Sequence, residues 1–154
     1  MANAELKTIE PIAVVGIEHK GAYDQIGAKF GEIFGMAGPG GWPIQGSLGI
    51  YFNDPSQTPV EDLRSKACII VPEGFDPGVP GVEAFEVAGG QYVVYRHMGS
   101  YAGLGDSWMK VYSEEIPRLK MDDNGPPFEV YVNNCNEVPE DELITDIYVP
   151  VKAL

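Results

Sequence analysis

The chain has 154 residues, a size typical of one folded domain that buries about two thirds of its unfolded surface. It carries 23 acidic against 10 basic residues, and this formal net charge of −13 argues against direct binding to nucleic acid or to anionic membranes. The sequence contains no apolar run of ~18 residues and no leader with a basic and then an apolar region, so we expect a cytoplasmic protein that does not cross a membrane.

The sequence repeats itself about 80 residues apart. Residues 19–23 (HKGAY) return 78 positions later as residues 97–101 (HMGSY). A second block repeats at a spacing of 80, with the equivalent pairs Tyr51 and Tyr131, Asn53 and Asn133, Pro59 and Pro139, and Leu63 and Leu143. Two copies are too few for a solenoid. We therefore expect one domain, residues 1–154, whose halves (about 9–74 and 82–151) meet at a pseudo-two-fold seam with a central ligand cleft.

The first half predicts a strand, a helix and two more strands. The β-branched run Pro11–Glu18 predicts a strand that ends at a turn. Apolar residues recur at helical spacing over Asp24–Phe34, which predicts an amphipathic helix. The Gly/Pro-rich stretch Met36–Pro43 predicts a surface loop, and the two later strands are expected at Ser47–Phe52 and Lys66–Val71.

Glycines interrupt the predicted helix of the first half. Gly27, Gly31 and Gly35 each cost up to ~1 kcal/mol relative to alanine in a helix interior. Either the helix backbone approaches a neighbouring strand closely there, or packing simply overrides helix propensity. Phe30 and Phe34 stand at the helical spacing of the apolar face, so we expect both in the core.

The second half follows the same order. A short strand is expected at Val82–Val87, and Gly89-Gly90 predicts a hairpin turn into a strand at Gln91–His97. The remaining predicted elements are a helix at Leu104–Ile116 and strands at Phe128–Val132 and Ile144–Val149. Together the two halves predict an α+β fold in which duplicated β-α-β-β units build an antiparallel sheet that carries two main helices.

The two halves differ most sharply at Glu129. Alternation along its strand places Glu129 and Tyr131 on one face, whereas the first half has Gly49 at the position equivalent to Glu129. A carboxylate in an otherwise apolar strand is costly unless it is paired, solvated or used. We therefore take Glu129 as a candidate for binding a ligand. The alternative is that its side chain points to water from a half-exposed strand.

Aromatic residues gather in the repeated blocks. The candidates for the walls of a pocket around Glu129 are Tyr131, Trp108, Tyr51, Tyr101 and Tyr112. A pocket with aromatic walls and one carboxylate attracts flat, apolar cations, through buried area and a cation–π contribution of roughly 0.5–2 kcal/mol. The alternative is that these side chains belong to the core, and for Trp108 and Tyr131 the two interpretations are evenly balanced.

Other signals for chemistry are weak. His19 and His97 occur in both halves, which favours a role in the turn from strand to helix over catalysis. Cys68 and Cys135 have no short spacing to each other or to a histidine, so we expect reduced, structural cysteines, no metal site and no cofactor. The sequence also lacks a Gly-x-Ser-x-Gly elbow and a phosphate-binding loop.

Several segments carry a family resemblance in combination. They are residues 88–94 (AGGQYVV), 128–134 (FEVYVNN) and 51–55 (YFNDP), the last followed by Thr58-Pro59. From about Ile9 to Val151 the chain resembles the GyrI-like family (SbmC-like, DNA gyrase inhibitor), which shares its fold with the effector-binding domains of AraC-type and MerR-type regulators.

The resemblance implies a duplicated β-α-β-β domain that binds hydrophobic, often cationic small molecules. It also implies a conserved glutamate at the floor of the site, which matches Glu129, with Tyr131 and Trp108 at pocket positions. No helix-turn-helix segment accompanies the domain in this sequence. We therefore expect a stand-alone binding protein that acts in sensing, sequestration or drug resistance, rather than a complete regulator.

Two alternatives stay open beside binding alone. Some stand-alone members resemble hydrolases of strained electrophilic toxins such as cyclopropanoids, and in that case Glu129 is the catalytic base and an aromatic side chain, Tyr131 or Trp108, holds the intermediate. The founding activity of the family is inhibition of DNA gyrase, which implies gyrase as a protein partner. We lean towards binding without catalysis.

Overall fold

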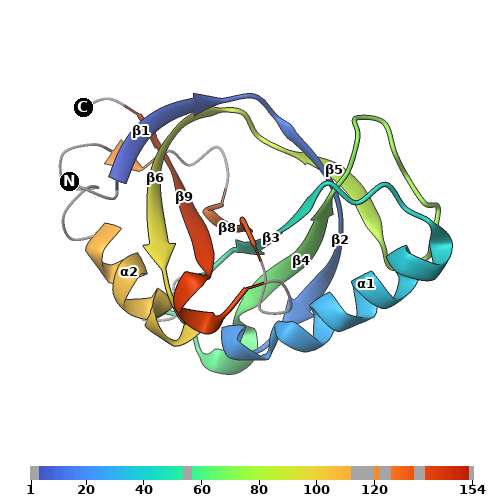
Figure 1. Ribbon diagram of the computed structural model, residues 1–154, viewed down its shortest axis with the longest axis horizontal. Helices are drawn as coiled ribbons and strands as arrows, with labels where there is room; N and C mark the ends of the chain where they lie inside the picture. Colours follow the sequence, from blue (N-terminus) through green and yellow to red (C-terminus); the bar gives the residue numbers. More distant parts are fainter. Residues whose placement is uncertain (1–3, 54–56, 112–119, 122–125, 134–137, 153–154) are drawn as a thin grey trace. The chain divides into compact units, whose positions relative to one another are not determined.

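The computed structural model describes residues 4–53, 57–111, 120–121, 126–133 and 138–152 (Figure 1). The chain divides into two compact units: unit 1 comprises Met1–Glu10 and Ala88–Leu154, and unit 2 comprises Pro11–Val87. Within the described residues, each unit has an antiparallel sheet and one α-helix. The predicted α+β class, with antiparallel strands and two main helices, is confirmed.

Unit 2 contains the first copy of the repeat. Its elements are β2 (Ile12–Lys20), η1 (Tyr23–Gln25), α1 (Gly27–Gly40), β3 (Gly46–Tyr51), η2 (Val60–Asp62), β4 (Arg64–Ile70) and β5 (Glu83–Val87). The strands lie in the order β3-β4-β2-β5, and every neighbouring pair is antiparallel. The series β2-α1-β3-β4 is the predicted β-α-β-β unit.

Unit 1 contains the second copy. Its elements are β1 (Ala4–Ile9), β6 (Gly90–Met98), η3 (Tyr101–Gly103), α2 (Leu104–Lys110), β7 (Lys120–Met121), β8 (Phe128–Tyr131), η6 (Glu140–Glu142) and β9 (Ile144–Lys152). The strands lie in the order β1-β6-β9-β8, and β7 pairs with β9. The series β6-α2-β8-β9 repeats the topology of unit 2. The last part of the predicted helix, residues 112–116, lies outside the described residues.

The strand that precedes each repeat pairs with the other repeat. β1 comes directly before β2 in the chain but pairs with β6, and β5 comes before β6 but pairs with β2. The predicted hairpin at Gly89-Gly90 is therefore wrong, because the strands on either side of it belong to different ladders. The sequence does not predict β1, because its side chains from Glu5 to Thr8 are exposed and form no buried apolar face. Backbone pairing holds such an edge strand and requires no apolar pattern in the sequence.

Helix α1 covers one face of the unit 2 sheet and lies alongside β2 and β4 (Figure 1). The buried cluster between helix and sheet consists of Val15, Ile17, Ile26, Ile33, Ala37, Ala67, Ile69 and Val71. Phe30 packs against the edge of this cluster. Phe34 does not: it is 38% exposed, so its predicted place in the core is wrong. It follows Ile33 directly, which turns its side chain about 100° away from the buried stripe.

The same helix starts and ends later than predicted. η1 occupies the expected start, and α1 then runs through residues 36–40, which were predicted to be a loop. Ala37 is fully buried one turn beyond Ile33, so the apolar stripe continues into this region. The helix ends at Gly41, which has a φ of 67°. There the N–H of Trp42 donates to the carbonyl of Ala37 at 3.0 Å, as in a Schellman motif.

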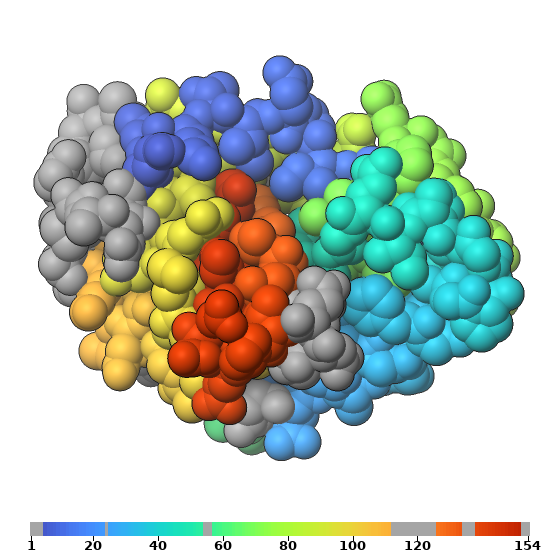
Figure 2. Space-filling view, viewed as in Figure 1, coloured from blue at the N-terminus to red at the C-terminus, as the bar shows by residue number. Residues whose placement is uncertain are grey.

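Gly31 gives a direct test of how glycine affects α1. Gly31 is exposed, and a Cβ at this position meets no atom within 4 Å. Segments coloured from blue to cyan, which include α1, lie at the surface in Figure 2. We expect Gly31→Ala to raise the free energy of unfolding by about 0.5–1 kcal/mol, because alanine loses less backbone entropy on folding. Urea unfolding followed by circular dichroism measures the change. Gly21→Ala, at a φ of 114°, is the control that must lower stability instead; a loss in both variants would contradict the prediction.

Cys68 is a buried, free thiol in β4. Burial raises the pKa of this thiol to about 12, so it stays protonated at neutral pH. Because the thiolate is the reactive form of cysteine, Cys68 has the properties expected of a structural residue. Cys135 lies outside the described residues. Within the part of the chain that the structure describes, no helix is long and apolar enough to cross a membrane.

Candidate functional site

The repeated histidines lie at the turns from strand to helix. His19 Nε2 is 2.9 Å from the carbonyl oxygen of Ala22, and His97 Nε2 is 2.8 Å from that of Ser100. A carbonyl oxygen only accepts hydrogen bonds, so each ring donates through Nε2. This shared geometry agrees with the turn role that the repeat predicts.

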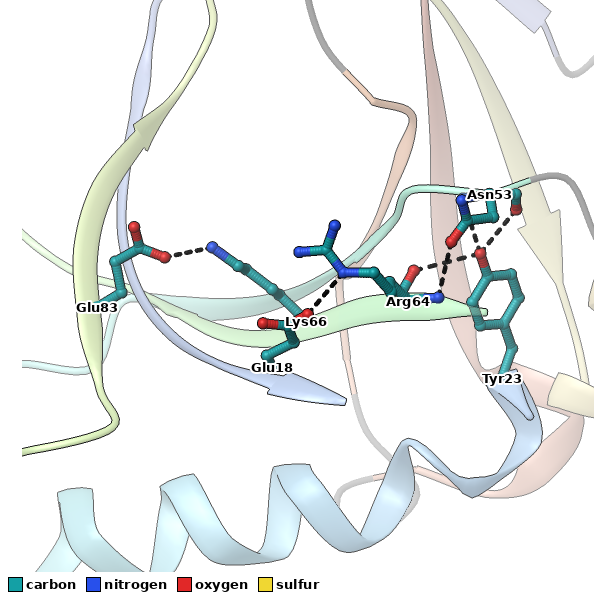
Figure 3. Close-up of polar contacts among 6 residues, drawn as sticks. All are labelled: Glu18, Tyr23, Asn53, Arg64, Lys66 and Glu83. Carbon is teal, nitrogen blue, oxygen red and sulfur yellow. Dashed lines mark hydrogen bonds and ion pairs between the residues drawn. The ribbon is translucent and has the colours of Figure 1, made fainter. Parts of the chain in front are cut away.

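The repeated asparagines shape the connection between the last two strands of each repeat. Asn53 Oδ1 accepts a hydrogen bond from the N–H of Arg64, and Asn133 Oδ1 accepts one from the N–H of Ile144, both at 2.8 Å. In unit 2 the hydroxyl of Tyr23 also donates to the carbonyl of Asn53 at 2.6 Å (Figure 3). Residues that recur in both halves thus build the fold that the halves share.

The two cations of β4 are paired within unit 2. Arg64 donates through Nε to Glu18 at 2.6 Å, and Lys66 is paired with Glu83 (Figure 3). The hydrogen bond from Arg64 lowers the pKa of Glu18. The ammonium of Lys66 also lies 4.5 Å from the ring centroid of Phe85. Both cations of β4 therefore have acidic partners within unit 2.

Glu129 is nearly buried in unit 1, with 4% of its surface exposed. Trp108 Nε1 on α2 donates a hydrogen bond to Oε2 at 2.5 Å, and the hydroxyl of Tyr131 donates to Oε1 at 2.9 Å. The second contact confirms that Glu129 and Tyr131 share one face of their strand. The alternative that Glu129 points to water is wrong.

The carboxylate lies on the face of the sheet that α2 covers. Glu129 on β8 pairs in register with Ile147 on β9, which pairs in turn with Tyr95 on β6. Ile147 and Tyr95 belong to the buried cluster of unit 1, against which Trp108 packs. A charge at such a position is costly without hydrogen bonds, so the neutral donors Trp108 and Tyr131 stabilise Glu129 in a largely apolar environment.

An aromatic pair extends this site towards the surface. The rings of Tyr101 and Tyr131 meet edge to face at 6.0 Å, and Tyr101 is 40% exposed. Unit 2 repeats the pair with Tyr23 and Tyr51 at 4.8 Å. The aromatic pair is therefore common to both units, whereas the carboxylate is particular to unit 1.

Two buried polar residues of unit 1, Ser107 and Thr145, were not predicted. Ser107 Oγ on α2 lies 2.7 Å from His97 Nδ1, and both residues are buried. Thr145 pairs in register with His97 on one side and with Tyr131 on the other. Its hydroxyl is buried and has no hydrogen-bond partner among the described residues, and a buried hydroxyl left unpaired costs about 1–3 kcal/mol. The sequence does contain one signal that could have pointed to Thr145: a hydroxyl residue recurs 80 positions apart, at Ser65 and Thr145.

The structure brings together four of the six predicted site residues. Glu129, Tyr131, Trp108 and Tyr101 form one connected group in unit 1. Tyr51 belongs to unit 2, and Tyr112 lies outside the described residues. Among the residues that are described, no three histidine, cysteine or acidic side chains cluster as a metal site would require.

Comparison with known proteins identifies a family and relatives in sequence. The model of the GyrI-like small molecule binding domain matches residues 2–152. A DNA gyrase inhibitor from Escherichia fergusonii is 32% identical over 108 residues, which cover 68% of this chain and 68% of that protein. The match to the family model thus extends over nearly the whole chain.

Solved structures share the fold at low sequence identity. The crystal structure of the EcmrR C-terminal domain matches with a TM-score of 0.77 at 17% identity, covering 98% of both chains. In the EcmrR–DNA complex the TM-score is 0.80 at 16% identity, and this chain spans 57% of the length of EcmrR. The structure of SAV2435 bound to tetraphenylphosphonium matches with a TM-score of 0.62 at 16% identity, covering 97% of this chain and 93% of that chain.

Proposed function

We propose that this chain, which belongs to the GyrI-like small molecule binding domain family, binds hydrophobic organic cations at Glu129 of unit 1. Binding of small molecules is the family property, and the cationic, hydrophobic nature of the ligand is our proposal. The observation that carries it is the buried carboxylate of Glu129 among aromatic side chains.

The electrostatics of the site favour a cation. The described hydrogen bonds to Glu129 come from the neutral donors Trp108 and Tyr131. A carboxylate removed from water interacts more strongly with a cation than an exposed one does, because solvent screens the pair less. A ligand cation that replaces one of these donors gains this interaction, and the aromatic faces beside it add cation–π attraction.

A relative with the same fold supports the choice of ligand. SAV2435 has been solved with tetraphenylphosphonium, which is a large aromatic cation without hydrogen-bonding groups. A ligand of this kind matches a site that combines one carboxylate with Trp108, Tyr131 and Tyr101. Such binding suits a protein that senses or sequesters toxic lipophilic cations, or that confers resistance to them.

Isothermal titration tests this proposal. We expect tetraphenylphosphonium to bind the wild-type protein, and the neutral analogue triphenylphosphine oxide to bind at least tenfold more weakly. Mass spectrometry of the recovered cation should return its original mass. Equal affinity for the two compounds, or no binding of either one, would contradict the proposal.

Hydrolysis is a second candidate, favoured by the contact between Tyr131 and Glu129. A buried carboxylate 2.9 Å from a phenol offers a base beside a proton donor. As a hydrolase, the protein would open a strained electrophile such as a cyclopropanoid with the addition of one water. Incubation of that substrate with wild type and Glu129→Gln, followed by mass spectrometry, tests this candidate: turnover must occur with the wild type and be absent in the variant.

DNA gyrase is a candidate partner through the relatives alone. The relative from Escherichia fergusonii is named a DNA gyrase inhibitor. The formal net charge of −13 suits contact with a basic protein surface. Added protein should then reduce DNA supercoiling by gyrase in the absence of any small molecule, and unchanged supercoiling would exclude this function.

A further inference from the structure

A row of polar side chains crosses the unit 1 sheet beside Glu129. His97 on β6, Thr145 on β9 and Tyr131 on β8 are register partners, so their side chains leave the sheet on the same face. Glu129 lies two residues before Tyr131 and shares that face. The row therefore lies next to the carboxylate proposed to bind the ligand cation.

Thr145 is the exception in this row. Both ring nitrogens of His97 have partners, namely Ser107 Oγ and the carbonyl of Ser100. The hydroxyl of Tyr131 donates to Glu129. The hydroxyl of Thr145 is buried, the residue as a whole is 0% exposed, and this hydroxyl has no hydrogen-bond partner in the described structure. A buried hydroxyl is normally paired, and no described residue pairs with this one, so a group on a ligand held at the neighbouring Glu129 is a candidate partner.

We infer that the Thr145 hydroxyl is a further ligand contact, which selects cations that carry a hydrogen-bonding group in addition to their charge. The inference rests on the proposed function, because it places this second group beside a cation held at Glu129. A threonine hydroxyl both donates and accepts, so hydroxyl, amine, ether and carbonyl groups all suit it. A cation that carries one of these groups can pair with the carboxylate of Glu129 and hydrogen-bond to the hydroxyl of Thr145 at the same time.

The register sets the spacing of the two groups on the ligand. Glu129 pairs with Ile147, which makes Thr145 its diagonal neighbour on the adjacent strand. Diagonal neighbours in a sheet lie about 7–8 Å apart. The hydrogen-bonding atom of the ligand should therefore lie about one aromatic ring away from its cationic centre.

Unit 2 provides the matched control. Ser65 occupies the equivalent place on β4, where it pairs in register with His19 and Tyr51, and its hydroxyl is likewise buried without a partner in the described structure. The strand beside it carries Gly49 where unit 1 has Glu129. Ser65 thus has the same local geometry without the carboxylate, so its removal should leave ligand selectivity unchanged.

Two probes that differ by one hydroxymethyl group test the inference. We would titrate tetraphenylphosphonium and its 4-(hydroxymethyl)phenyl analogue into wild type, Thr145→Val, Thr145→Ser and Ser65→Ala. The wild type should prefer the hydroxymethyl probe by about 5–10-fold, as one neutral hydrogen bond predicts. Thr145→Val should abolish the preference, whereas Thr145→Ser and Ser65→Ala should keep it.

The outcomes separate this inference from the proposed function. If the wild type binds tetraphenylphosphonium but shows no preference, the Thr145 contact is wrong and the cation site stands. The Thr145 contact is also wrong if Thr145→Val weakens both probes equally, because that result indicates a packing role. If neither probe binds the wild type, the proposed function itself is wrong.

Thermal unfolding of the protein without ligand gives an independent readout. Thr145→Val removes a hydroxyl that has no partner among the described residues, so its unfolding midpoint should equal or exceed that of the wild type. A lower midpoint would overturn the inference, because it would mean that an internal water already satisfies the hydroxyl.

Discussion

Replacing Glu129 by glutamine is expected to weaken the binding of tetraphenylphosphonium at least 30-fold. Loss of one partner of a buried charge pair costs about 2–5 kcal/mol, and 1.4 kcal/mol corresponds to a factor of ten. Glutamine keeps the size of the side chain and removes its charge. Binding of the neutral analogue triphenylphosphine oxide should change much less, since that compound gains nothing from the carboxylate.

Isothermal titration of two variants measures this effect. Glu140→Gln removes an exposed carboxylate from the same unit, so it controls for the change in net charge. Circular dichroism should show that both variants are folded. An equal loss of affinity in the two variants would indicate long-range attraction by the acidic protein, and it would remove Glu129 from the site.

Replacing Gly16 by alanine is expected to lower the free energy of unfolding by about 1–3 kcal/mol, the usual cost of overpacking a core. Gly16 lies on β2 directly opposite Cys68 on β4. A Cβ at Gly16 would come within 2.6 Å of Cys68 Sγ and 3.1 Å of the carbonyl oxygen of Ala67. The short, buried side chain of Cys68 has little room to move away.

The double variant Gly16→Ala/Cys68→Ala isolates this contact. The Cβ of Cys68 is 3.5 Å from the added methyl group, an ordinary contact distance, so removal of the sulfur should recover most of the loss. Urea unfolding of the wild type, both single variants and the double variant completes a mutant cycle. Additive losses of stability would show that the close contact with the backbone carbonyl oxygen of Ala67, and not the one with the sulfur, dominates.

The candidate site was partly predictable from the sequence. The alternation along β8 correctly placed Glu129 and Tyr131 on one face, and the comparison of the two halves singled out Glu129 against Gly49. The repeat and the family resemblance made Trp108 a candidate for the pocket, but its hydrogen bond to Glu129 spans 21 residues of sequence and depends on how α2 packs. The lack of a partner for the Thr145 hydroxyl among the described residues can be recognised only from the side chains and backbone groups that surround it in the structure.

Two predictions about the fold are wrong because the composition of a short segment does not show what that segment packs against or pairs with. The prediction of a loop at Met36–Pro43 followed from its glycines and Pro39, but the burial of Ala37 keeps residues up to Gly40 helical. Gly89-Gly90 lies between two predicted strands, and this local pattern predicts a hairpin. Those strands pair with different partners, and turn composition carries no information about pairing at a distance.

The sequence by itself determined the duplicated β-α-β-β unit, the α+β class, the resemblance to the GyrI-like family and the face on which Glu129 lies. The repeated unit, the class and the face of Glu129 follow from periodicity and internal repetition, and the resemblance rests on the motifs at residues 51–55, 88–94 and 128–134; all of these are read directly along the chain. Only the tertiary structure decided that Glu129 is buried, that Trp108 and Tyr131 hold it, and that Thr145 lacks a partner among the described residues. Burial and hydrogen bonding depend on the atoms that packing brings together from distant parts of the chain, and strand alternation specifies a face but not what covers it.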